Sequence, residues 1–117
     1  MRKKEVVNKV NYLMTENRKY GLLLKDIDSL VSIISANHKV DKIILFGSRA
    51  KGNFTPGSDI DLVIKGQLLK LNDILDFKIK TDNLSLPYKI DLIIYDSIIE
   101  PDLISHINRV GISLFER

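Results

Sequence analysis

Residues 43–64 read IILFGSRAKGNFTPGSDIDLVI, and this stretch predicts two strands joined by a turn that can hold a phosphate. The apolar run at 43–46 is typical of a short buried strand. Gly47 and Ser48 follow it directly, and the backbone N–H groups and hydroxyl of such a turn can bind an anion. The next three residues fit one helical turn, which Gly52 is placed to end.

The second half of the stretch carries a pair of carboxylates. Apolar and polar residues nearly alternate over 59–64, and the two-residue period of a strand puts Asp59 and Asp61 on the same face. The same alternation recurs at 90–94, where Asp91 projects opposite to the apolar residues. If these strands are neighbours, three carboxylates converge beside the turn.

Three converging carboxylates predict a metal site. Like charges a few ångströms apart raise one another's pKa and resist joint ionisation, so the cluster needs a neutralising partner. Mg²⁺ is commonly held by one or two carboxylates together with water and substrate phosphate. A phosphate-binding turn beside an Asp-x-Asp strand is therefore chemically coherent.

The two motifs together resemble the signature of a known family. Phe46 to Gly52 and Pro56 to Leu62 are similar to the pattern Gly-Ser, ten residues, Asp-x-Asp of the minimal nucleotidyltransferases (MNT), small relatives of DNA polymerase beta. Asp91 stands at the place of the third family carboxylate. The resemblance runs from about residue 21 to the end of the chain, including 107–112, which is similar to the family's terminal helix and turn.

The resemblance implies site residues and ligands. Its expected substrate is ATP and its expected cofactor is Mg²⁺ in a two-metal site. The implied catalytic and metal-binding residues are Asp59, Asp61 and Asp91, and the candidate nucleotide-binding residues are Gly47, Ser48, Arg49, Lys51 and Ser58. Several of these have plainer interpretations: Ser48 can cap the short helical turn, Arg49 and Lys51 can be solvated surface charges, and Ser58 can close the loop.

The remaining pattern predicts an α/β (α+β) fold, a small mixed sheet with helices packed on one face, similar to the palm-like core that the family implies. Helices are expected at 24–37 and around 68–79, strands at 42–46, 59–64 and 88–95, and a short helix from Pro101 that Gly111 caps. The apolar stripe of the second helix, assigned to the core, consists of Leu68, Leu71, Leu75 and Ile79.

Four further ring-bearing residues are candidates for function. His38 and His106 have no partner at metal-ligand spacing, so both are expected to be structural. Tyr88 and Tyr95 flank the Asp91 strand and could stack on a base, but aromatic residues suit strands, so packing is the favoured interpretation.

The length of the chain and the distribution of its charge limit its possible domain organisation. A chain of 117 residues makes one domain, taken as 21–117, preceded by a basic extension at 1–20 that is expected to be helical. The extension holds six basic and two acidic residues, a formal +4, which leaves −1 for residues 21–117 out of the chain's +3. The catalytic part has no basic excess, which argues against direct nucleic-acid binding.

The chain has no cysteine, which fits a reducing compartment, and no apolar stretch approaches the length of a membrane span. A cytoplasmic protein without a membrane segment is therefore expected.

The family resemblance implies an acceptor outside this domain. Members of this length are often paired with a helical HEPN-domain toxin, onto which the transferase, acting as antitoxin, transfers AMP. That is the expected function. The alternatives are nucleotidylation of a small molecule such as an aminoglycoside, with a partner subunit or oligomer completing the pocket, and a non-catalytic antitoxin that acts by binding alone.

Overall fold

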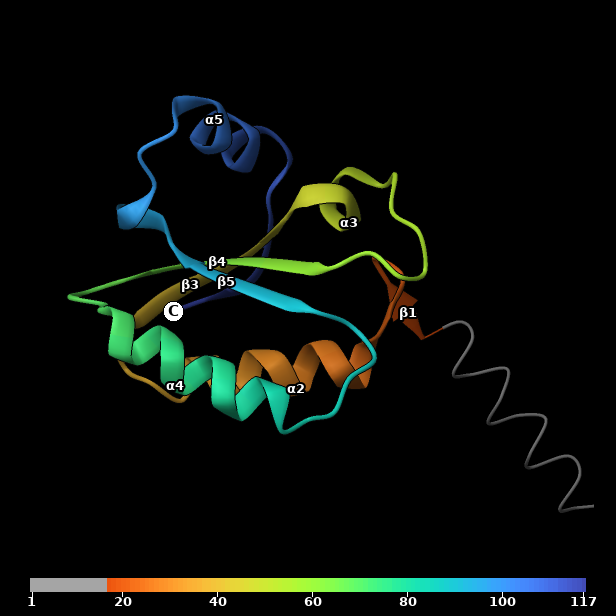
Figure 1. The fold of residues 1–117 in the computed structure, drawn as a ribbon, viewed down its shortest axis with the longest axis horizontal. Helices are drawn as coiled ribbons and strands as arrows, with labels where there is room; N and C mark the ends of the chain where they lie inside the picture. Colours follow the sequence, from red (N-terminus) through yellow and green to blue (C-terminus); the bar gives the residue numbers. More distant parts are fainter. Residues whose placement is uncertain (1–16) are drawn as a thin grey trace, which may run out of the picture.

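The computed structural model describes residues 17–117, and a four-stranded mixed sheet lies at its centre (Figure 1). The strands, in spatial order, are β5 (Ile90–Ile94), β4 (Ile60–Gly66), β3 (Val40–Phe46) and β6 (Ile112–Glu116). Strand β3 runs antiparallel to β4 and β6, whereas β4 and β5 are parallel. The predicted mixed α/β fold class is confirmed. Strand β6 was not predicted.

Helices cover both faces of this sheet. Helices α2 (Leu24–Ser35) and α4 (Leu71–Asp82) pack on one face, as predicted, and enclose the larger apolar core (Figure 1). The short α3 (Gly47–Lys51) and α5 (Pro101–Val110) lie on the other face. There α5 buries Ile107 against Ile44 and Val63, so the prediction that the helices share one face does not hold for α5.

Helix α4 buries a different stripe from the predicted one. Leu68, Leu71, Leu75 and Ile79 are 82%, 69%, 50% and 64% exposed. The core side is formed instead by Phe77 and Thr81, with Ile74 packed beside them.

Polar contacts at the first turn of α4 accompany this packing. Asp73 accepts a hydrogen bond from the Lys70 N–H at 2.9 Å and pairs with Lys39 Nζ, also at 2.9 Å. Lys39 follows α2 in the chain, so the pair links α4 to the segment after α2. A partly exposed ion pair contributes at most about 1 kcal/mol, so burial of the Phe77 ring contributes more to the orientation of α4.

We expect Leu71→Lys to change the free energy of unfolding by less than about 0.5 kcal/mol, because the side chain is already largely in water. Phe77→Ala, the matched core change on the same helix, should cost about 3–5 kcal/mol. Urea unfolding of both variants measures the difference. Equal losses would mean that α4 packs through the predicted stripe.

A small hairpin precedes α2. Strands β1 (Arg18–Lys19) and β2 (Leu22–Leu23) pair antiparallel, and Leu22 is buried in the core. Of the predicted helical extension at 1–20, the structure describes only 17–20, which form strand and turn; the rest lies outside the described residues. Among residues 17–117, no helix is long and apolar enough to cross a bilayer.

Candidate active site

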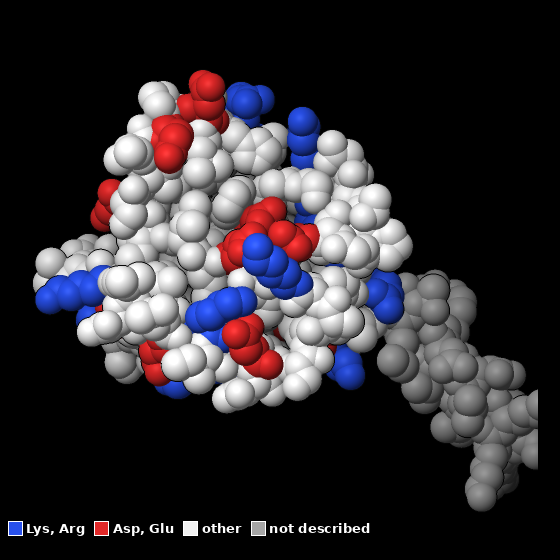
Figure 2. Space-filling view, in the orientation of Figure 1, with Lys and Arg blue, Asp and Glu red and all other residues white. Residues whose placement is uncertain are grey.

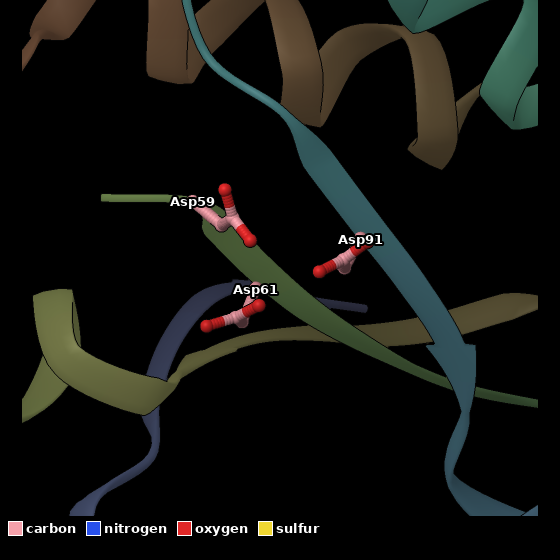
Figure 3. Close-up of side chains that lie close together, drawn as sticks. All are labelled: Asp59, Asp61 and Asp91. Carbon is pink, nitrogen blue, oxygen red and sulfur yellow. The ribbon is translucent and has the colours of Figure 1, made fainter. Parts of the chain in front are cut away.

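The three predicted carboxylates point toward one another (Figure 3). They lie on the face of the sheet that also carries α5, opposite the larger core. In the parallel pair β4–β5, Asp61 lies directly opposite Asp91. Ile60 and Leu62, which alternate with the aspartates, are buried in the core on the other face, so Asp59 and Asp61 point away from it. One oxygen from each of the three carboxylates lies within 4.8 Å of the others.

This convergence is electrostatically unfavourable for the protein alone. Partial burial raises the pKa of Asp61 above its ordinary value of 3.8, and the negative charges of Asp91 and Asp59 raise it further. Lys89 Nζ lies 3.7 Å from Asp91 and offsets part of the charge. Figure 2 shows acidic side chains gathered beside a basic one at the centre of the molecule.

The donor set fits a hard divalent cation. Carboxylate oxygens are the ligands that Mg²⁺ takes, with water and phosphate in its other positions, and here one oxygen from each of three carboxylates lies within 4.8 Å of the others. Asp59, Asp61 and Asp91 are the residues that would hold it.

We expect Asp61→Asn to raise the melting temperature of the protein in EDTA at neutral pH, because it removes an ionised group that is disfavoured in the folded state. Because the pKa of Asp61 is higher in the folded protein than in the unfolded chain, the wild type is stabilised as the pH falls through the folded-state pKa. The difference in melting temperature between Asp61→Asn and the wild type should therefore shrink towards pH 3.8. Melting curves at both pH values measure this. Asp96→Asn, at an exposed carboxylate outside the cluster, is the control, and an equal shift for both variants would contradict the prediction.

Gly47 brings the turn against the carboxylates. It follows β3, where Phe46 pairs with Asp61, and has a φ of +73°, which favours glycine. A Cβ built on Gly47 would overlap the Asp61 carboxylate. Glycine is thus required both for the turn and for its approach to Asp61.

Ser48 offers an available hydroxyl beside this turn. It is half-buried, and within residues 17–117 its hydroxyl makes no hydrogen bond. The residue at the N-cap of α3 is Phe46, so Ser48 does not fill that position. Gly52 ends the helix in the left-handed conformation with a φ of +92°, as expected for a C-terminal cap.

Arg49, a nucleotide-binding candidate whose plainer interpretation was a solvated surface charge, is 1% exposed, so the surface-charge interpretation is wrong. Its guanidinium donates to the carbonyls of Tyr20 and Ser58 at 2.9 and 2.8 Å and to that of Pro56 at 3.3 Å. The rings of Phe54 and Tyr88 lie 5.2 and 4.8 Å from its central carbon, in cation–π contact. These contacts tie the loop that leads into Asp59 to the N-terminal hairpin.

The other two nucleotide candidates lie at the rim. Lys51 is exposed at the end of α3. Ser58 closes the preceding loop, because its hydroxyl accepts the Thr55 N–H at 2.9 Å. Tyr88 packs on Arg49, and the Tyr95 hydroxyl donates to Asn108 at 3.3 Å. Both tyrosines therefore have packing partners, in agreement with the packing role favoured from the sequence.

Sequence reasoning missed one residue at the site. His106, expected to be only structural, accepts the Gly47 N–H on Nε2 at 3.0 Å. Fifty-nine residues separate the pair, and no local pattern signals a contact across that distance. His38, the other histidine, is exposed after the end of α2.

A mixed sheet that presents a Gly-Ser turn and three converging carboxylates defines a nucleotidyltransferase site. A family model described as polymerase beta, nucleotidyltransferase, matches residues 28–117. The chain therefore belongs to the polymerase beta nucleotidyltransferase family and is a nucleotidyltransferase. Among curated proteins, none matches it.

Solved structures share this fold. A toxin–antitoxin structure with AMP-PNP has a TM-score of 0.65 and 22% identity, over 78% of this chain and 73% of that one. A tri-AMPylated Shewanella oneidensis HEPN toxin in complex with its MNT antitoxin gives a TM-score of 0.62 and 20% identity, over 80% and 72%. An MntA–HepT toxin–antitoxin structure gives 0.61 and 20%, over 80% and 73%. The predicted resemblance to minimal nucleotidyltransferases is confirmed.

Proposed function

We propose that this protein transfers AMP from ATP to a hydroxyl of a HEPN-type partner protein and thereby acts as its antitoxin. The main support is the arrangement of the site. Three carboxylates converge beside a Gly-Ser turn, and the serine hydroxyl of that turn has no hydrogen-bond partner among the described residues. Support comes from solved structures of the same fold, which include a complex with an AMPylated HEPN toxin.

In this proposal the turn holds the triphosphate. The Ser48 hydroxyl and its own N–H donate to phosphate oxygens, and Gly47 keeps that turn against Asp61. Asp59 and Asp61 would hold Mg²⁺, which would supply charge neutralisation of the phosphates there. The Gly-Ser turn follows β3, and the two carboxylates lie at the start of β4, so the sheet fixes a bound nucleotide relative to the carboxylates.

Asp91 faces the acceptor. Its side chain is 42% exposed and lies on β5, an edge strand of the sheet, so a macromolecular hydroxyl can approach it. Asp91 draws the proton from that hydroxyl or completes the metal site. The acceptor oxygen forms a bond to the α-phosphorus, the bond from that phosphorus to the bridging oxygen breaks, and pyrophosphate leaves.

The experiment is incubation of the protein with α-labelled ATP, Mg²⁺ and a candidate HEPN ribonuclease from the same organism. We expect label on the HEPN protein, loss of its ribonuclease activity, and no label with Asp59→Asn. If ribonuclease activity is silenced equally by the wild type and by Asp59→Asn without any label, the protein acts by binding alone. Parallel reactions with an aminoglycoside as acceptor test the small-molecule alternative.

A further inference from the structure

His106, on α5, contacts the phosphate-binding turn directly. Its Nε2 accepts the Gly47 N–H at 3.0 Å, and its ring meets the Phe46 ring edge-on at a centroid distance of 6.3 Å. The Asp61 carboxylate contacts the same turn, because it occupies the space where a Cβ of Gly47 would lie. The turn is therefore in contact with both a strand residue and a helix residue.

The bond determines which groups of the turn remain for a ligand. The Gly47 N–H has its acceptor in His106 Nε2 and is therefore already satisfied within the protein. This N–H is not available to a ligand. The donors that remain for a phosphate at this turn include the N–H and hydroxyl of Ser48.

Helix α5 gives His106 a fixed position. The next residue, Ile107, is 2% exposed and packs on Ile44 and Val63 of the sheet. Asn108 accepts a hydrogen bond from Tyr95 at 3.3 Å, which ties the same turn of α5 to the segment after β5. An acceptor on such a helix can hold a backbone N–H in one direction.

We propose that His106 is a positioning residue for nucleotide binding: by accepting the Gly47 N–H, it holds the Gly-Ser turn in the conformation that presents Ser48 to the triphosphate. The proposal rests on the nucleotide half of the proposed function and is independent of the acceptor. It assigns α5 a role at the active site, although that helix contributes no carboxylate.

The test compares His106→Leu, which removes the acceptor, with His106→Gln, whose side-chain oxygen can accept the same N–H. His38→Leu, at the exposed histidine, is the matched control. Affinity for AMP-PNP with Mg²⁺ is measured by calorimetry, exchange of the Gly47 amide hydrogen by NMR, and folding by thermal melts. None of these measurements needs the partner protein.

Losing one backbone hydrogen bond at a half-buried site should weaken nucleotide affinity about tenfold in His106→Leu. Gly47 amide exchange should accelerate by a similar factor, whereas His106→Gln and His38→Leu should stay near the wild type in both. Unchanged affinity and exchange in His106→Leu would overturn the proposal, as would equal losses in the Leu and Gln variants, which would indicate packing alone.

These measurements distinguish failure of the proposed function from failure of the role proposed for His106. If the wild type binds no nucleotide, the proposed function fails, and the proposal for nucleotide binding fails with it, although Gly47 exchange still shows whether His106 orders the turn. If the wild type binds nucleotide and His106→Leu binds it equally well, only the role of His106 fails. If His106→Leu does not fold, the decision rests on His106→Gln: wild-type affinity and exchange support the acceptor role, and a loss in either overturns it.

Discussion

Gly47→Ala should lower nucleotidyl transfer by about a hundredfold or more, because a misplacement of about 1 Å at reacting groups has effects of that size. Alanine at this position meets two obstacles. The φ of +73° is unfavourable for any residue with a Cβ, and that Cβ would overlap the Asp61 carboxylate. Either the turn or the carboxylate has to move, and both are parts of the site. Transfer rates and affinity for AMP-PNP with Mg²⁺ measure the loss.

Gly52→Ala separates the two obstacles. Gly52 has a φ of +92°, but a Cβ there would meet nothing within 4 Å. We expect this variant to lose roughly 1–2 kcal/mol of stability from backbone strain and to keep transfer activity while it remains folded. If Gly52→Ala loses as much transfer as Gly47→Ala at equal folded fraction, strain alone explains both, and the contact with Asp61 has no special role.

The carboxylate cluster could be predicted from the sequence because strand periodicity determines which side chains share a face. Alternation over 59–64 placed Asp59 and Asp61 together, and the same argument oriented Asp91. What the pattern left open was whether the two strands are neighbours. The register, with Asp61 opposite Asp91, supplies that answer.

Helix α4 shows where periodicity alone is insufficient. Its sequence contains two apolar stripes, and the one with more leucines lies in solvent. Phe77 of the other stripe fills the core, and Asp73 beside it pairs with Lys39, a contact across thirty-four residues. His106 and Gly47 are likewise paired at long range. Such contacts form only when the chain is folded, and single-sequence patterns do not contain them.

For Arg49 the sequence left two interpretations open, a phosphate ligand and a solvated surface charge. The structure shows a buried side chain whose donors satisfy three carbonyls of the surrounding chain. A buried arginine keeps its charge, and here that charge is balanced by carbonyl dipoles and two aromatic faces. Its observed contacts therefore organise the loop before Asp59.

Arg49→Leu should consequently lower the free energy of unfolding by about 3–5 kcal/mol, because three carbonyls would lose their donor and each unsatisfied polar group costs about 1–3 kcal/mol. The carbonyls of Tyr20, Pro56 and Ser58 would lose their donor, and the loop leading into Asp59 would lose its tie to the N-terminal hairpin. Urea unfolding measures the loss.

Two further variants distinguish the network from charge alone. Arg49→Lys should recover only part of the stability, because an ammonium group cannot reproduce the planar fork that reaches three carbonyls. Arg109→Leu removes an exposed arginine that donates to Ser105 at 3.3 Å, and should change stability by less than about 0.5 kcal/mol. If Arg49→Leu is as stable as Arg109→Leu but loses nucleotide affinity, Arg49 contacts phosphate during the reaction and the loop-organising role is wrong. Loss of stability in Arg49→Leu, partial recovery in Arg49→Lys and none in Arg109→Leu would instead show that the fold of the loop before Asp59 depends on this one guanidinium.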